Sequence, residues 1–132
     1  MAEFVFEEHF KVRDYELDLQ GIVNNAVYQN YLEHTRHEFL NAKGVNFKEL
    51  HETGYDAVVI RSEIDYKKPL QSGDEFVVKI GMEREGRLRM VFHQQIVRKT
   101  DQQIMVNAKI FAACIFNGRP VEPLFIFEKL GI

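Results

Sequence analysis

Hydrophobic positions between residues 25 and 44 recur with the period of an α-helix. The side chains that would share one face follow the i, i+3, i+4, i+7 spacing, and they are Tyr28, Tyr31, Leu32, Thr35, Phe39 and Ala42. Asn24 or Asn25 is suited to cap the start of this helix, and Gly44 is suited to end it. The pattern therefore predicts one long amphipathic helix in the first third of the chain.

Elsewhere hydrophobic and polar positions alternate, which is typical of half-buried β-strands. A first strand is indicated by Phe4, Phe6, His9 or Phe10, and Val12, and a loop follows at residues 14–21. After a connection at residues 45–54, four longer alternating segments cover residues 58–66, 76–82, 88–96 and 104–116. In the first of these segments the expected inward set is Val58, Ile60, Ser62, Ile64 and Tyr66. Turn-forming residues separate the segments at 69–74, 85–86 and 100–102, and residues 117–120 end the last one.

This order of elements favours an α+β fold, in which a curved antiparallel sheet wraps around one long central helix. Strands longer than the usual five or six residues must curl, and one helix can cover only one face of the sheet. A second apolar set would then need cover from elsewhere, and it comprises Val59, Val91, Val97, Phe111 and Ile115. We therefore expect a homo-oligomer, most simply a twofold dimer.

Length, composition and charge limit the classes of protein to which this chain could belong. The chain has 132 residues, a length that favours a single domain over residues 1–132, and its 45% hydrophobic and 28% charged residues are ordinary for a globular protein. A formal net charge of -3 argues against a general nucleic-acid binder. The first ten residues lack the pattern of a signal peptide, and the apolar stretches are too short for a membrane span. We expect a cytoplasmic enzyme or binding domain.

The segment DLQGIVNNAVYQNYLEHTR, residues 18–36, carries the clearest candidate chemistry. It places the carboxylate of Asp18 a few residues before the unpaired amides at the start of the predicted helix. Such amides can bind an oxyanion or a polarised carbonyl. A base or nucleophile beside an oxyanion hole is the minimum equipment for hydrolysing an ester or thioester.

Each of these residues also has a purely structural interpretation. Asp18 and Gly21 suit the first and fourth positions of a type I turn, and the two asparagines suit helix capping. Tyr28 and Tyr31 are typical of core or interface positions. Further along the predicted helix, Glu33 and Arg36 have the spacing of a local ion pair.

No metal site is expected. His34 and His37 have a spacing that permits a metal pair, but they lack the carboxylate pattern of a metalloenzyme helix. Cys114 is the only cysteine, which excludes an internal disulfide, and it follows an inward set that favours a core thiol.

Residues 18–36 resemble the motif of hotdog-fold acyl-CoA thioesterases of the 4-hydroxybenzoyl-CoA thioesterase type. The turn YKKPLQSGD at residues 66–74 and the closing segment NGRP at residues 117–120 are also similar to that family. The resemblance implies a single hotdog thioesterase domain without a metal or redox cofactor. It also implies homodimers or homotetramers whose active sites lie at the subunit interface.

The resemblance assigns roles to several residues of the motif. Asp18 matches the catalytic carboxylate, acting as nucleophile or as general base on water. The backbone N–H of Asn25 matches the amide that polarises the thioester carbonyl, and Gly21, Val23, Asn24 and Tyr28 fall at substrate-binding positions. Many members of the family carry a histidine after the turn, whereas this chain has Asn24 and Asn25. An imidazole therefore cannot assist from that position, and the Asn25 side chain is left to orient water or the carbonyl.

Four basic residues are candidates for binding the carrier of the acyl group, and they are Lys67, Lys68, Arg87 and Arg89. Coenzyme A presents a pyrophosphate and a 3′-phosphate, which Lys and Arg side chains bind. An acyl carrier protein would also favour basic residues because its partner surface is acidic. The structural alternative is a solvated face.

The sequence thus predicts an acyl-CoA thioesterase that releases a free acid and CoA. The first alternative is an acyl-carrier-protein thioesterase with the same chemistry. A second is a non-catalytic hotdog protein that binds acyl thioesters, although such a binder does not need the carboxylate of Asp18. A hotdog dehydratase is disfavoured because it would need a histidine near the helix start.

Overall fold

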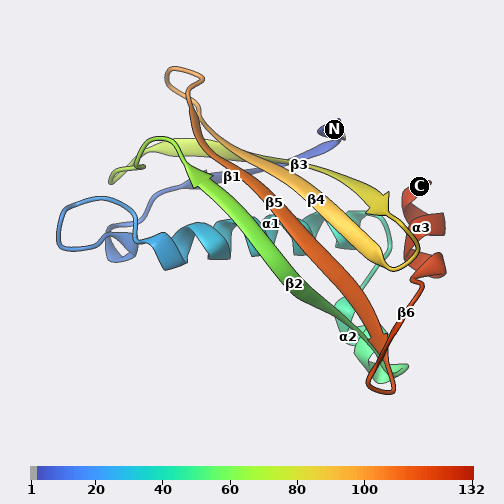
Figure 1. Cartoon of the computed structure of the whole chain (residues 1–132). Coiled ribbons are helices and arrows are strands. Elements are labelled where there is room, and N and C mark those ends of the chain that lie inside the picture. The colour runs from blue at the N-terminus through green and yellow to red at the C-terminus, as the bar shows by residue number, and fades with distance from the viewer. Residues whose placement is uncertain (1–2) are drawn as a thin grey trace.

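In the computed structural model, which describes residues 3–132, a curved antiparallel sheet wraps over one long helix (Figure 1). The strands are β1 (Phe6–Lys11), β2 (Tyr55–Tyr66), β3 (Glu75–Glu85), β4 (Arg89–Arg98), β5 (Ile104–Phe116) and β6 (Arg119–Val121). The helices are α1 (Asn25–Ala42), α2 (Phe47–Glu52) and α3 (Leu124–Leu130), with a 3-10 turn, η1 (Asp14–Glu16), before α1.

The sheet has the strand order β1-β3-β4-β5-β2, and the short β6 pairs with β5. Every pairing is antiparallel, and the long strands β2 to β5 are ten to thirteen residues long. The expected α+β hotdog architecture is confirmed, with α1 lying along the concave face of the sheet (Figure 1).

Helix α1 forms where the periodicity predicts it. Asn24 is the N-cap, and its side-chain oxygen accepts a hydrogen bond of 2.9 Å from the backbone N–H of Ala26. The helix ends at Ala42, just before Gly44, whose φ of +80° suits a glycine. Because the cap fixes the first turn, the position of the helix N-terminus is set by local sequence.

The core lies between α1 and the concave face of the sheet. The helix contributes five buried apolar side chains, namely Tyr28, Tyr31, Leu32, Phe39 and Leu40. From the sheet come Phe76, Val78, Ile80, Met90, Phe92, Ile96, Val106 and Ile110, all of which are buried. Ala42, which the periodicity also placed on the buried face, is exposed because the helix ends there.

The predicted inward face of β2 is wrong for its first half. The register of β2 against β5 shifts between Val59 and Arg61, so Ile60 is a bulge residue. Ala57 and Val59 therefore lie opposite Cys114 and Ala112 on the concave side, whereas Val58 does not. A bulge inserts one extra residue and reverses the alternation beyond it, and a simple period of two does not reveal it.

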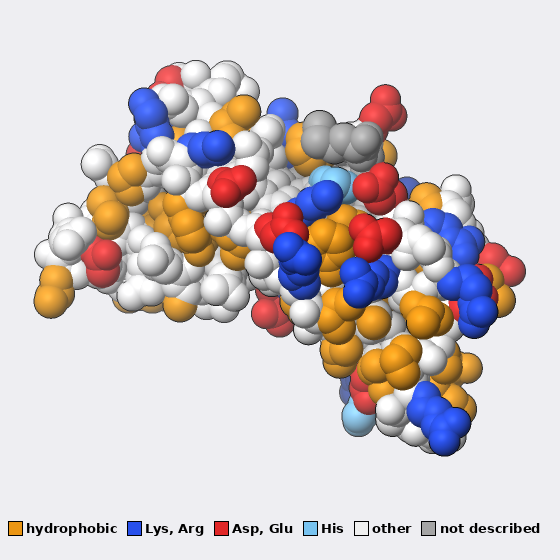
Figure 2. All heavy atoms as spheres, in the orientation of Figure 1, with side chains coloured by type: hydrophobic (Ala, Val, Ile, Leu, Met, Phe, Trp, Pro, Cys, Tyr) orange, Lys and Arg blue, Asp and Glu red, His pale blue; other side chains and the backbone are white. Residues whose placement is uncertain are grey.

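The second apolar set does not need an external partner as a whole. Val91, Val97 and Phe111 are buried within this chain. On the sheet face turned away from α1, the guanidinium of Arg61 lies 5.7 Å from the centre of the Phe111 ring and the ammonium of Lys109 lies 5.6 Å from it. Charged side chains gather over the middle of this face (Figure 2). Long basic side chains thus cover apolar surface with their stems.

Exposed apolar side chains gather instead along the edge strand β2. Val58, Val59 and Ile60 are all exposed, with 49% of Val59 accessible. An edge strand also presents unpaired backbone groups, which can pair with another strand. The expectation of an oligomer therefore rests on this edge, to which Val59 of the second apolar set belongs, and it stays a prediction. Among residues 3–132, no helix combines the length and hydropathy that a membrane crossing requires.

Truncating the centre of the α1 face tests this packing. Leu32 is 0% exposed, so Leu32→Ala is expected to lower the free energy of unfolding by about 2–5 kcal/mol through lost burial and a residual cavity. The matched control is Leu124→Ala in α3, where the side chain is 53% exposed and the expected change is within about 0.5 kcal/mol. Denaturant unfolding measures both, and equal losses would contradict the core assignment.

Candidate active site

The loop that carries Asp18 is tied to the turn that follows β2. Its backbone closes on itself, because the Asp18 N–H donates to the carbonyl of Ile22 at 2.8 Å. The N–H of Val23 then donates to the carbonyl of Leu70 at 3.0 Å, and Ile22 forms a β-bridge with Gln71. Two segments far apart in sequence therefore hold the approach to α1 in one position.

The Asp18 carboxylate makes the predicted turn and keeps one oxygen available. Its Oδ1 accepts hydrogen bonds from the backbone N–H of Gln20 at 2.8 Å and, more weakly, of Ile22 at 3.4 Å. Its Oδ2 has no hydrogen-bond partner among residues 3–132, and the side chain is half-buried. The turn interpretation and a chemical role are therefore compatible, since each uses a different oxygen.

The first amide of α1 is an available donor. The N–H of Ala26 is occupied by the Asn24 side chain, and the N–H of Val27 donates to the Asn24 carbonyl at 2.9 Å. No hydrogen bond within residues 3–132 uses the N–H of Asn25. The positive end of an eighteen-residue helix thus presents one free donor at the position that the sequence assigned to carbonyl polarisation.

Tyr28 and Tyr31 are buried and fix the base of this site. The Tyr28 hydroxyl oxygen accepts a hydrogen bond of 2.8 Å from the N–H of Leu70, and burial raises the pKa of this phenol. The Tyr31 hydroxyl donates to Glu16 Oε1 at 2.8 Å. The core interpretation of both tyrosines is confirmed, and contact of Tyr28 with substrate stays a prediction.

Glu16 is a buried acid that the sequence analysis did not single out. Besides the Tyr31 hydroxyl, its Oε1 accepts the backbone N–H of Arg13 at 2.8 Å, and its carbonyl accepts the N–H of Asn24. Glu16 thus accepts the N-cap N–H of η1 as the acid of a capping box does, but Arg13 has no side-chain acceptor, so the usual sequence signature of that motif is absent. Neither this contact nor the partner on α1 could be read from the sequence.

The four predicted basic residues are not brought together within one chain. Lys67 and Lys68 follow Tyr66, whose ring lies 5.3 Å from that of Tyr28, so they are near the Asp18 loop. Arg87 and Arg89 lie at the β3–β4 hairpin, at the other end of the sheet (Figure 1). There Arg87 pairs with Glu122 at 3.5 Å and Arg89 with Glu85 at 3.3 Å. The phosphate-binding roles of all four stay predictions.

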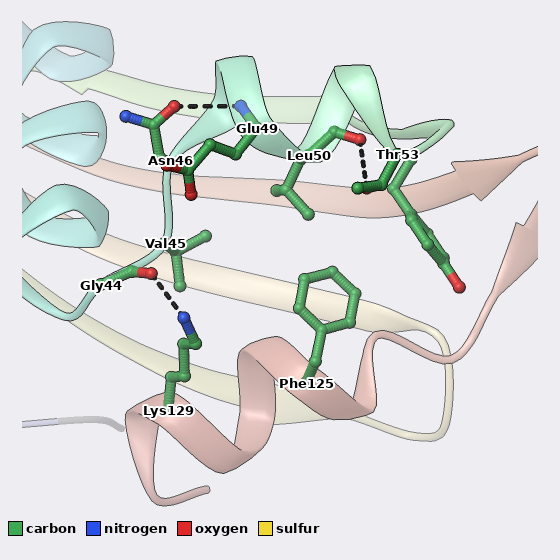
Figure 3. Close-up of a pocket in the computed structure, with 9 residues that line it drawn as sticks. Gly44, Val45, Asn46, Glu49, Leu50, Thr53, Phe125 and Lys129 are labelled. Atoms are coloured by element: carbon green, nitrogen blue, oxygen red, sulfur yellow. Dashed lines mark hydrogen bonds between the residues drawn. The ribbon is translucent and has the colours of Figure 1, made fainter.

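A cavity of about 440 Å³ lies away from Asp18, beyond the C-terminal end of α1 (Figure 3). It is lined by residues of the α1–α2 connection, α2 and α3, and the Lys129 ammonium donates to the Gly44 carbonyl at 2.7 Å beside it. Neither Asp18 nor Asn25 lines this cavity. Both lie on the open surface of the single chain.

Neither the histidines nor the cysteine form a second candidate centre. Among residues 3–132, no group of three or more His, Cys, Asp or Glu side chains could hold a metal ion. His37 lies 3.8 Å from Glu33 on the helix surface. Burial raises the pKa of the Cys114 thiol, which makes a nucleophilic thiolate unfavourable.

Comparison with known proteins identifies a matching family and several similar relatives. The family model described as thioesterase superfamily matches residues 20–105. The chain is 42% identical over 123 residues to the Arabidopsis thaliana protein named acyl-acyl carrier protein thioesterase ATL3, chloroplastic, covering 92% of this chain and 64% of that protein. It is 37% identical over 121 residues to a putative esterase of Aquifex aeolicus, covering 91% of this chain and 93% of that protein.

A solved structure shows the same fold. The crystal structure of a hypothetical protein from Aquifex aeolicus matches with a TM-score of 0.88 and 30% identity, covering 96% of this chain and 99% of that one. The chain spans less than two thirds of the Arabidopsis relative, 64% of its length.

Removing the Tyr28 hydroxyl tests the tie beneath the site. Tyr28→Phe leaves the Leu70 N–H without its partner in a buried position, so we expect a loss of about 1–3 kcal/mol in the free energy of unfolding. Tyr66→Phe is the matched control because the exposed Tyr66 ring packs on Tyr28. Unfolding in denaturant measures both, and an unchanged Tyr28→Phe stability would argue against the hydrogen bond.

Proposed function

This chain belongs to the thioesterase superfamily, and from that premise we propose that it hydrolyses an acyl thioester at Asp18 and the N-terminus of α1. The observation that carries the proposal is that two polar groups of one short segment are unused. Asp18 Oδ2 and the Asn25 N–H both lack partners among residues 3–132, and they stand at the two ends of residues 18–25.

The Asn25 amide is proposed to stabilise the charge that develops on the carbonyl oxygen. As the tetrahedral species forms, this oxygen becomes negative, and a fixed N–H at the positive end of the α1 dipole stabilises it without reorganisation. Loss of one such donor in other enzymes costs about 2.7–4 kcal/mol of barrier. Asn24 supports this role indirectly, because it satisfies Ala26 and leaves Asn25 free.

Asp18 can act in two ways that give the same products. As a nucleophile, its carboxylate attacks the acyl carbon, the C–S bond breaks, and water then cleaves the mixed anhydride. As a general base, it takes a proton from water while the water oxygen attacks the acyl carbon. In both routes the sulfur leaves as a thiol once protonated, and the acid is released.

Two carriers of the acyl group are candidates. The sequence resemblance predicts acyl-CoA, and Lys67 and Lys68 are exposed beside the Asp18 loop where they could meet its phosphates. The name of the 42%-identical Arabidopsis relative, an acyl-acyl carrier protein thioesterase, favours an acyl carrier protein instead. The same two lysines would suit the acidic surface of that partner, so the reaction is proposed for a phosphopantetheine thioester of either kind.

We further propose that the site is completed by a second copy of the chain. Asp18 and Asn25 are open to solvent on one side, and β2 offers an exposed edge with Val58, Val59 and Ile60. Pairing across this edge would bury apolar surface and satisfy free backbone groups. A homodimer or a homotetramer built from it would place the site at a subunit interface.

Replacing the Asp18 carboxylate by its amide tests the catalytic role. In Asp18→Asn the side-chain oxygen can still accept the Gln20 N–H, so the turn should persist while the charge is lost. We expect kcat for acyl-CoA or acyl-carrier-protein substrates to fall by about 10²–10⁴-fold, measured as free acid by chromatography.

Asp14→Asn is the control, since Asp14 is an exposed acid in η1, four residues before Asp18, and bonds to the hydroxyl of Ser72. Its activity should match that of the wild type. Full activity in Asp18→Asn would refute the assignment. Inactivity of the wild type on every CoA and carrier-protein ester would favour the non-catalytic binder.

Neutralising the lysines beside the site tests how the carrier binds. The double variant Lys67→Ala, Lys68→Ala should raise KM for acyl-CoA about tenfold and hardly change KM for a short pantetheine thioester, because only CoA carries the phosphates. The comparison variant is Arg61→Ala on the sheet face turned away from α1, which should leave both constants unchanged. Equal KM increases for both substrates would remove the phosphate-binding role.

A further inference from the structure

We propose that the buried guanidinium of Arg36 binds an oxygen at the far end of the acyl group, so that the preferred substrates carry a polar oxygen there. This inference rests on the proposed function, because it names the acyl class that the same site would accept. The binding region is the α1–sheet hollow, a cavity of about 240 Å³. Its lining is mostly apolar and includes Val59, Met90 and Phe92, and its polar side chains are those of Arg36, Glu33 and His37.

Arg36 is a buried cation without a carboxylate. Its side chain lies on the core face of α1 and the residue is only 9% exposed. No carboxylate oxygen lies within 4.0 Å of its guanidinium among residues 3–132, so the ion pair with Glu33 does not form. Glu33 pairs with His37 at 3.8 Å and acts on Arg36 only through its more distant charge. Burial lowers the pKa of this guanidinium, as expected for a charge removed from water.

The sheet holds the guanidinium in place with a neutral amide. Arg36 donates from Nη1 to Gln94 Oε1 at 3.1 Å, and Gln94 in turn donates from Nε2 to the Leu32 carbonyl at 2.9 Å. Gln94 is only 2% exposed and stands among apolar residues of β4. The oxygen and the nitrogen of the Gln94 side-chain amide are therefore both used, and together they position one side of Arg36.

The remaining N–H groups of Arg36 are what the α1–sheet hollow offers to a ligand. No buried side-chain nitrogen or oxygen among residues 3–132 lacks a hydrogen-bond partner, so the unused guanidinium nitrogens retain access to the hollow. A guanidinium so little exposed is costly unless oxygens occupy its donors, and neither Glu33 nor His37, the other polar side chains of the hollow, bonds to it. Its planar fork suits a carboxylate best and also suits a hydroxyl or ketone oxygen.

The α1–sheet hollow lies at a distance from the reactive end that an acyl chain can span. Arg36 follows Asn25 by about three turns of α1, or roughly 16 Å along the helix axis. The strand β2 runs beside this path in the opposite direction. Its Tyr66 contacts Tyr28 near Asp18, and its Val59 lines the hollow at the other end. A medium-length chain lying between α1 and β2 would therefore bring its terminal atoms to Arg36.

Three CoA esters of equal chain length test this inference: dodecanoyl, ω-hydroxydodecanoyl and dodecanedioyl. The wild type is expected to show a higher kcat/KM for the two oxygen-bearing esters than for dodecanoyl-CoA. In Arg36→Met, which keeps length and apolar character, kcat/KM for dodecanedioyl-CoA should fall about 10- to 100-fold, while that for dodecanoyl-CoA changes less than about threefold. The hydroxyl and carboxylate arms show which oxygen Arg36 prefers.

The control is Arg61→Met, which removes an exposed arginine on the opposite face of the sheet and should change none of these ratios. Calorimetric binding of free dodecanedioate to the wild type and to Arg36→Met provides a readout that does not depend on hydrolysis. If Arg36→Met folds poorly, the wild type alone still tests the inference. It should bind dodecanedioate more tightly than dodecanoate, and equal affinities would overturn the role of Arg36.

The outcomes separate this inference from the proposed function. Arg36-dependent binding of dodecanedioate without hydrolysis of any ester would support the α1–sheet hollow and overturn the enzymatic proposal. Hydrolysis of all three esters at equal kcat/KM, unchanged in Arg36→Met, would overturn the role of Arg36 and leave the thioesterase proposal intact. A loss that is equal for all three esters would show that Arg36 only supports the fold, which also overturns its proposed role.

Discussion

The structure depends on the tie between the start of α1 and the turn that follows β2. The Val23 N–H donates to the Leu70 carbonyl, and the Leu70 N–H donates to the Tyr28 hydroxyl oxygen. These bonds join the first third of the chain to the sheet at the point where the helix begins. They therefore set the position of the free Asn25 amide, the Asp18 loop and the axis along which α1 crosses the sheet.

Sequence periodicity predicted the elements well and the faces of the strands less well. Helix α1 begins after Asn24 and ends before Gly44 because capping and termination are local chemistry. The face of β2 was missed at Ile60, since a bulge depends on how β2 pairs with β5. Val91 and Phe111 looked like surface in need of a partner, yet both are buried within the chain, and the basic side chains of Arg61 and Lys109 lie over the Phe111 ring.

The residues of the candidate site also differ in how well the sequence alone identified them. Asp18 and Asn25 could be singled out because both lie within one short motif. Glu16 could not, since its partner Tyr31 is fifteen residues away and becomes its neighbour only when α1 folds back. Arg36 and Gln94, 58 residues apart, are buried polar side chains on the largely apolar inner faces of α1 and β4. Such interruptions in a regular pattern mark places where the fold keeps a polar group for a specific purpose.

The single cysteine bears on how a reaction at this site can be observed. Cys114 is the only thiol in the chain, and it is buried in β5 with a raised pKa. A thiol-reactive dye would therefore meet almost no background from the folded protein. Any coenzyme or pantetheine sulfhydryl set free in solution could be read continuously, and a sudden rise in protein-derived colour would report unfolding in the same cuvette.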